Sequence, residues 1–124
     1  MQIFLAIAAI LGGLSVAGGA FASHALQNRL TERAIEVFGT GIRYQMYHAL
    51  ALLVVALLLG TAKQALPWLT AAGWSFVVGI VLFSGSLYLI SLADIKAVGP
   101  ITPLGGLAFL IGWGCLVISA FRLP

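Results

Sequence analysis

Four nearly uncharged apolar stretches make up most of this 124-residue chain. They run from about Ile3 to Ala22, Tyr44 to Leu59, Trp68 to Leu92 and Leu104 to Phe121. A helix needs about 20 apolar residues to cross the hydrocarbon core of a bilayer, so four crossings leave no room for a domain in water. The sequence therefore predicts an all-α membrane protein, with four transmembrane helices in a compact bundle and a single domain over residues 1–124.

Composition excludes two other classes of protein. Only 7% of the residues are charged, whereas soluble domains average about 25%, so a water-soluble monomer is excluded. The net charge of +3 comes from scattered basic residues, and a nucleic-acid-binding face needs clustered ones. The one cysteine, Cys115, has no partner in the chain for a disulfide or a cysteine metal site.

Residues 23–42 form the only sizeable polar segment. Thr31 can cap a helix whose first turn contains Glu32. The segment places apolar side chains on one face and charged ones on the other, which is typical of a helix lying in the membrane interface. Gly39 and Gly41 can end such a helix, because glycine tolerates a left-handed cap. We therefore expect a short amphipathic interfacial helix between the first two spans.

The basic residues predict an orientation. One side of a four-span bundle has four of them and the other side has two: Arg29, Arg33, Arg43 and Lys96 against Lys63 and Arg122. Loops rich in Lys and Arg face the cytoplasm. We expect a multi-pass protein of a bacterial plasma (inner) membrane with both termini outside.

The best candidate for a ligand site is where the first two spans meet. This predicted polar corner consists of His24, Arg43, Tyr44, Tyr47 and His48. Helical spacing puts Tyr44, Tyr47 and His48 on one face and places Arg43 over Tyr47. Because consecutive spans are antiparallel, we expect both histidines near the same membrane surface. Ionisable residues at membrane depth are candidates for function, although Arg and Tyr at a helix end also serve as membrane anchors.

Other chemistry has little support in the sequence. Two histidines fall short of the usual four ligands of a structural zinc site, and a haem would need both as axial ligands. Ser23 beside His24 does not make a nucleophile and base pair. The spans contain no Asp or Glu for a proton-coupled transporter. We expect no enzymatic activity, no cofactor and no metal.

Small residues predict close contact between helices. Ala9, Gly13 and Ala17 lie four apart in the first span, a spacing that lets helix backbones approach in lipid. The third span has a polar patch of Ser84, Ser86 and Tyr88, for which we expect a packing role, with the serines bonded to their own helix or to a neighbour. The glycines expected to pack helices are Gly13, Gly19, Gly85, Gly105 and Gly106.

Four strings together resemble the YgdD/YwdK-like family of small four-span membrane proteins of unknown function. They are GAFASHAL from Gly19, YQMYHALALL from Tyr44, GSLYL from Gly85 and TPLGGLAFLIGW from Thr102. The resemblance covers nearly the whole chain, and the marked residues of the family fall on Gly19, Phe21, His24, Tyr44, His48, Gly85, Tyr88, Thr102, Pro103, Gly105, Gly106 and Trp113. The chain departs from the family at Ala22 or Ser23, where a glycine is common. The resemblance implies four spans and no particular activity.

These observations favour a non-enzymatic accessory or scaffold protein, held in a membrane assembly or a homo-oligomer. The alternative is a protein that binds a lipid or a quinone at the predicted polar corner, and a small-solute transporter has less support. The expected partners are membrane lipids and a membrane protein or a second copy of the chain.

Overall fold

The computed structural model describes residues 1–124, and all of its regular elements are helices, without strands. Its elements are α1 (Gln2–Phe21), η1 (Ala22–Leu26), α2 (Glu32–Thr61), α3 (Leu66–Gly79), η2 (Ile80–Ser84), α4 (Gly85–Ala93), η3 (Lys96–Val98) and α5 (Ile101–Ala120). The segments α3, η2 and α4 form one crossing. Four helices of 25, 30, 28 and 25 residues are long and apolar enough to span a membrane. The predicted all-α fold with four transmembrane helices is confirmed.

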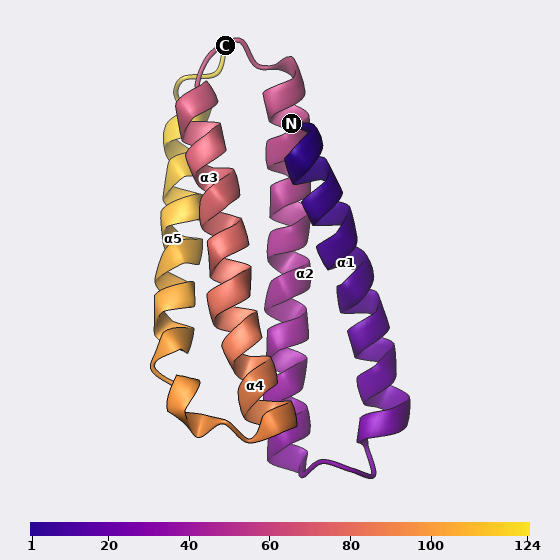
Figure 1. Cartoon of the computed structure of the whole chain (residues 1–124). Coiled ribbons are helices and arrows are strands. Elements are labelled where there is room, and N and C mark those ends of the chain that lie inside the picture. The colour runs from indigo at the N-terminus through magenta and orange to yellow at the C-terminus, as the bar shows by residue number, and fades with distance from the viewer.

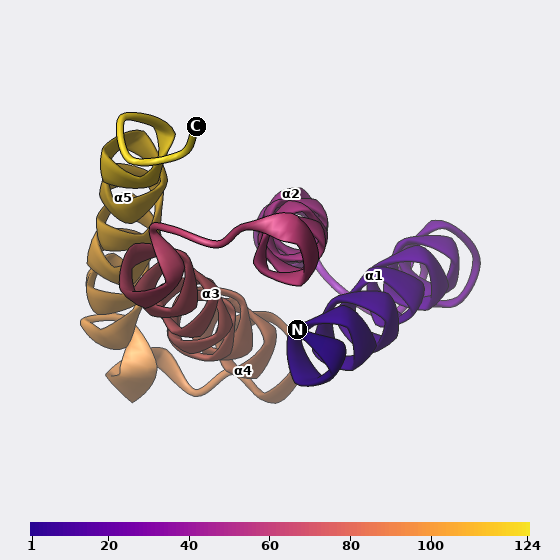
Figure 2. The same cartoon turned by 90° about the horizontal axis from the view of Figure 1, so that it is seen from above.

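The four crossings run antiparallel to their neighbours in the sequence, with both termini at the same end (Figure 1). That end also contains the loop between α2 and α3, while the loops after η1 and α4 lie at the other end. Seen from above, α2 lies between α1 and the α3–α5 pair (Figure 2). The most extensive contacts join α1 to α2 and α3 to α5. Helix α1 therefore lies at one edge of the bundle.

Helix α2 corrects the prediction of a separate interfacial helix. The cap is confirmed, because Thr31 Oγ1 accepts a hydrogen bond of 3.1 Å from the backbone N–H of Ala34. The helix then continues unbroken for 30 residues through Gly39 and Gly41, and no glycine in the chain has a positive φ. A side chain at Gly41 would place its Cβ 2.7 Å from the ring of Tyr88. Gly41 therefore admits a neighbouring helix and does not end its own.

The third crossing begins and ends at left-handed residues. Ala65 (φ 62°) precedes α3, and Pro67 lies in the first turn of that helix, where a missing N–H costs no helical hydrogen bond. Asp94 (φ 53°) ends α4; a short polar side chain tolerates this conformation better than most. The π-helical turn η2 lies in the middle of the crossing and contains the buried Ser84.

Glycines let aromatic side chains fill the core. A Cβ at Gly73 would lie 2.6 Å from the ring of Phe4, and one at Gly112 would lie 2.6 Å from the ring of Phe76. Phe76 is fully buried between the helices. Because lipid chains are as apolar as these side chains, close packing and not hydrophobic transfer holds the helices together.

The predicted packing glycines divide into two groups. A Cβ at Gly105 would collide with the backbone of Phe83. A Cβ at Gly19 would lie 3.8 Å from Ile42, and one at Gly106 would lie 4.0 Å from Phe83. Gly13 and Gly85 have nothing within 4 Å, so neither packs against another helix of this chain. Spacing along a helix identified small residues but could not tell which face meets a neighbour. Other close glycine contacts are at Gly18, Gly41, Gly60, Gly73, Gly79 and Gly112.

Candidate functional site

Polar side chains from several crossings meet inside the bundle. Gln45 Nε2 on α2 donates a 2.8 Å hydrogen bond to the backbone carbonyl of Leu11, which lies near the middle of α1. The hydroxyl of Tyr88 on α4 donates a 2.6 Å hydrogen bond to Gln45 Oε1. Gln45 therefore joins three crossings at mid-depth. We use the name central polar cluster for Gln45, His48, Ser84, Tyr88 and Trp113.

His48 connects α2 to α5. Its Nδ1 lies 2.7 Å from the carbonyl oxygen of Tyr44, and the indole N–H of Trp113 donates a 3.1 Å hydrogen bond to its Nε2. Since an indole can only donate, Nε2 accepts and Nδ1 carries the proton. The imidazole also stacks on Phe109, with ring centroids 3.5 Å apart and planes 6° apart. Both ring nitrogens are thus in use, and a metal or haem could bind here only by displacing one of these partners.

Ser84 and Ser86 confirm the expectation that serines in the third span bond a helix backbone. Ser84 Oγ, which is fully buried, donates a 2.7 Å hydrogen bond to the carbonyl of Gly41. Ser86 donates to the carbonyl of Phe83 at 2.9 Å, and its hydroxyl also bonds that of Thr102 on α5. These bonds attach the third crossing to both α2 and α5.

The polar groups of the central polar cluster are satisfied by hydrogen bonds. Every buried side-chain nitrogen and oxygen in the protein has a hydrogen-bond partner, as a low-dielectric interior demands. No side chain of the cluster lines a cavity. Its geometry fits the task of fixing the register and spacing of the helices. No group of three or more His, Cys, Asp and Glu side chains comes together anywhere in the structure.

The structure divides the predicted polar corner. Tyr44, Tyr47 and His48 share one face as predicted, with Tyr44 in ring contact with both others. Tyr44 and Tyr47 are exposed on the side of the bundle, while His48 is buried. Arg43 does not lie over Tyr47, because its Nη2 donates a 3.1 Å hydrogen bond to Thr40 Oγ1, toward the start of α2.

His24 lies apart from His48. It is exposed in η1, which lies at the same end of the bundle as the start of α2 (Figure 1). His48 is sixteen residues beyond Glu32, which corresponds to about 24 Å along the helix at 1.5 Å per residue. The prediction that both histidines lie near one membrane surface is therefore wrong. It assumed that the second helix begins near Tyr44, whereas the helix begins three turns earlier.

Sequence reasoning placed Tyr88 with Ser84 but missed that Gln45, Tyr88 and Trp113, from three different helices, belong to one cluster. All three lie in the strings that carry the family resemblance. A further signal is the spacing of Gly41, Gln45 and His48, which puts a glycine and two polar side chains on one helix face. A face of that kind inside an apolar helix indicates a buried polar contact with a neighbouring helix.

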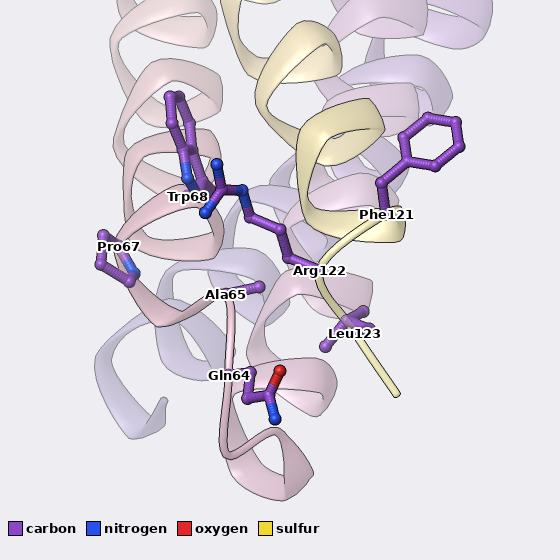
Figure 3. Close-up of a pocket in the computed structure, with 7 residues that line it drawn as sticks. All are labelled: Gln64, Ala65, Pro67, Trp68, Phe121, Arg122 and Leu123. Atoms are coloured by element: carbon purple, nitrogen blue, oxygen red, sulfur yellow. The ribbon is translucent and has the colours of Figure 1, made fainter.

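Hollows at the two ends of the bundle contain most of the charged side chains. At the end that contains the termini, Trp68 and Arg122 line a hollow of about 390 Å³, and the Arg122 side chain reaches toward the Trp68 ring (Figure 3). The guanidinium carbon of Arg122 lies 5.8 Å from the ring centre of Trp68, within range of a cation–π contact. This contact ties the chain end to the start of α3. At the opposite end, Arg43 and Glu36 line a hollow of about 350 Å³ between α1 and α2.

Comparison with known proteins gives a consistent result. A family model described as "Protein of unknown function (DUF423)" matches residues 18–106. The UPF0382 membrane protein YwdK of Bacillus subtilis is 44% identical over 122 residues, and the UPF0382 membrane proteins SH2409 of Staphylococcus haemolyticus and SAB0533 of Staphylococcus aureus are 40% and 41% identical. Each alignment covers 98% of both chains. No solved structure matches the chain.

These relatives are named membrane proteins, which agrees with the four apolar helices and confirms that this is a membrane protein. The resemblance to YwdK-like proteins is confirmed as well. The chain belongs to the family of small membrane proteins of unknown function described as DUF423.

Proposed function

We propose that this protein is a non-enzymatic scaffold of a membrane assembly, and that the outward face of α1 is where it meets another copy of itself or another membrane protein. One observation carries the proposal. Ala9, Gly13 and Ala17 are exposed on one face of α1, and a Cβ built at Gly13 would meet nothing within 4 Å. Small residues four apart are the pattern by which two transmembrane helices approach closely.

The position of α1 supports this role. It lies at the edge of the bundle (Figure 2). Only 17% of the residues in its most apolar 18-residue stretch are buried, compared with 39% for the corresponding stretch of α2. Its other small residues, Gly18 and Gly19, face Ile42 on α2. The face with Gly13 is thus separate from the face that packs within the chain.

The central polar cluster supports the non-enzymatic part of the proposal. Its donors and acceptors are engaged with one another or with backbone carbonyls, whereas catalysis needs a nucleophile and a base that face a substrate. Binding of a lipid or quinone at the predicted polar corner has less support, because His24, Arg43 and His48 lie in three different places. Transport needs a polar path, and the polar groups at mid-depth form a packed cluster with no cavity beside it.

Gly13→Leu tests the proposal. The added side chain meets open space in the single chain, so the fold should be unaffected, while a helix docked on this face should be pushed away. Gly114→Leu is the matched control, since Gly114 is exposed on α5 and also has nothing within 4 Å. Stepwise photobleaching of the fluorescently tagged protein in membranes of its own host, or light scattering in mild detergent, reports the assembly.

We expect the wild type and Gly114→Leu to form complexes above the 13.0 kDa protein mass, and Gly13→Leu to be a monomer. Two results would contradict the proposal. The first is a wild type that is monomeric and without a protein partner both in membranes and in several detergents. The second is an assembly that both substitutions leave unchanged.

A further inference from the structure

A groove separates the start of α2 from the end of α4, with a volume of about 590 Å³. Arg33 and Val37 line it from α2, and Leu87 lines it from α4. Asp94, which directly follows α4, and Lys96 on η3 complete the lining named here. A neighbouring hollow shares Asp94 with this groove and adds Arg29. We use the name α2–α4 groove for the two hollows together.

The α2–α4 groove has an excess of positive charge. Arg29, Arg33 and Lys96 face one carboxylate, Asp94, so the lining has a net formal charge of +2. The one ion pair in the protein joins Arg33 to Glu36 at 3.6 Å, with both side chains largely exposed. Such an exposed pair contributes little energy. Arg29 and Lys96 are not engaged by any carboxylate, so they are free to hold an anion.

The lining of the groove changes from charged at the end of the bundle to apolar further in. Arg29, Asp94 and Lys96 lie at the end of the bundle, outside the helical parts of α2 and α4. Val37 lies one turn further into α2 than Arg33, and Leu87 lies about two turns before Asp94. A phospholipid has the same order along the membrane normal, with a charged headgroup above apolar chains.

We propose that the α2–α4 groove binds one anionic phospholipid. The phosphate lies among Arg29, Arg33 and Lys96, because guanidinium groups match phosphate oxygens in pairs and Lys adds a point charge. The upper part of the acyl chains lies along Val37 and Leu87. Asp94, held at the rim by its left-handed backbone, accepts from hydroxyl groups of the headgroup. The net charge of +2 favours an anionic headgroup such as that of phosphatidylglycerol over a zwitterionic one.

The side of the membrane agrees with this occupant. The groove lies at the end of the bundle that has Arg29, Arg33, Arg43 and Lys96, which we expect to face the cytoplasm. Anionic lipids of that leaflet attract basic residues at the membrane surface. The site is independent of the outward face of α1, so failure of either proposal leaves the other standing.

Native mass spectrometry of the detergent-solubilised protein tests the site, with added phosphatidylglycerol or phosphatidylcholine of the same acyl chains. The double variant Arg29→Gln/Lys96→Gln removes two exposed cations that make no side-chain hydrogen bond or ion pair. Lys63→Gln/Arg122→Gln removes the same charge from the opposite end. We expect one phosphatidylglycerol per chain in the wild type, and about thirtyfold weaker binding in the groove variant. The control variant should bind as the wild type does.

A second variant separates a shaped site from simple attraction to a basic surface. Ala34 lines both hollows and is only half-buried, so Ala34→Phe fills the groove without changing its charge. We expect this variant to lose phosphatidylglycerol while keeping the melting temperature of the wild type. The proposal is overturned by equal retention of both lipids, by equal loss in both charge variants, or by full binding in a folded Ala34→Phe protein. Displacement of the lipid by millimolar glycerol phosphate would also overturn it, since that result assigns the groove to a soluble phosphate.

Discussion

The indole N–H of Trp113 donates a 3.1 Å hydrogen bond to Nε2 of His48, and this bond joins the last crossing of the bundle to the second. The two residues are 65 positions apart in the sequence. Because the indole has no acceptor, the bond also fixes which imidazole nitrogen carries a proton. His48 thus joins two helices, because Nδ1 is bonded within α2 and Nε2 is bonded to α5.

Trp113→Phe should destabilise the protein because it leaves Nε2 of the buried His48 without a donor. We expect a loss of about 1–2 kcal/mol, the upper part of the range for hydrogen bonds between transmembrane helices. Unfolding in mixed micelles of increasing SDS content measures it. Trp74→Phe is a matched control, since Trp74 is as exposed as Trp113 (46% against 45%) and makes no hydrogen bond. An equal loss in both variants would show that ring volume, and not the hydrogen bond, is responsible.

Gln45 and Tyr88 should show an energetic coupling. Their 2.6 Å hydrogen bond joins α2 to α4, while Gln45 also bonds Leu11 on α1. A double-mutant cycle with Gln45→Leu and Tyr88→Phe should give a coupling of about 0.6–1.7 kcal/mol, between the mean and the maximum measured for hydrogen bonds between transmembrane helices. Tyr47→Phe, which removes an exposed hydroxyl without a hydrogen bond, should change stability by less than either. A coupling near zero would remove Gln45 and Tyr88 from the cluster as an energetic unit.

Local signals in the sequence were sufficient for some features and not for others. Thr31 and Glu32 predict the start of α2, because a cap and the helix it begins lie within one turn. Gly41 misled the prediction, because its role depends on Tyr88, 47 residues away, which fills the space where a side chain would be. The residue type alone does not distinguish a glycine that ends a helix from one that makes room for a neighbouring helix.

The same reasoning explains the outcome for the candidate site. The contact of Tyr44 with Tyr47 and His48 follows from helical spacing and was predicted. The partners of Gln45 are 34 and 43 residues away, and no pattern within one helix specifies them. The predicted depth of His48 depended on where α2 begins. Because α2 begins three turns earlier than predicted, His48 lies in the interior and not near the membrane surface.

Gly105→Ala and Gly85→Ala should change stability in opposite directions. A Cβ at Gly105 would lie 2.7 Å from Cα of Phe83, a backbone atom that cannot rotate away, so we expect a loss of about 1–3 kcal/mol from overpacking. A Cβ at Gly85 meets nothing within 4 Å, so alanine should stabilise the helix by about 0.5–1 kcal/mol. Thermal unfolding in detergent measures both. Equal effects would mean that α5 does not approach the third crossing as closely as the structure shows.

Two single cysteines should label from opposite sides of the membrane. Asn28 and Gln64 are exposed in the loops at the two ends of the bundle. In a Cys115→Ala background, which removes the buried native thiol, an impermeant maleimide should reach Gln64→Cys but not Asn28→Cys in right-side-out membrane vesicles. The reason is the excess of Arg and Lys at the Asn28 end, which holds that end in the cytoplasm. Permeabilised vesicles serve as the control, since both variants should then react. The reverse pattern would place the termini in the cytoplasm and the α2–α4 groove in the outer leaflet.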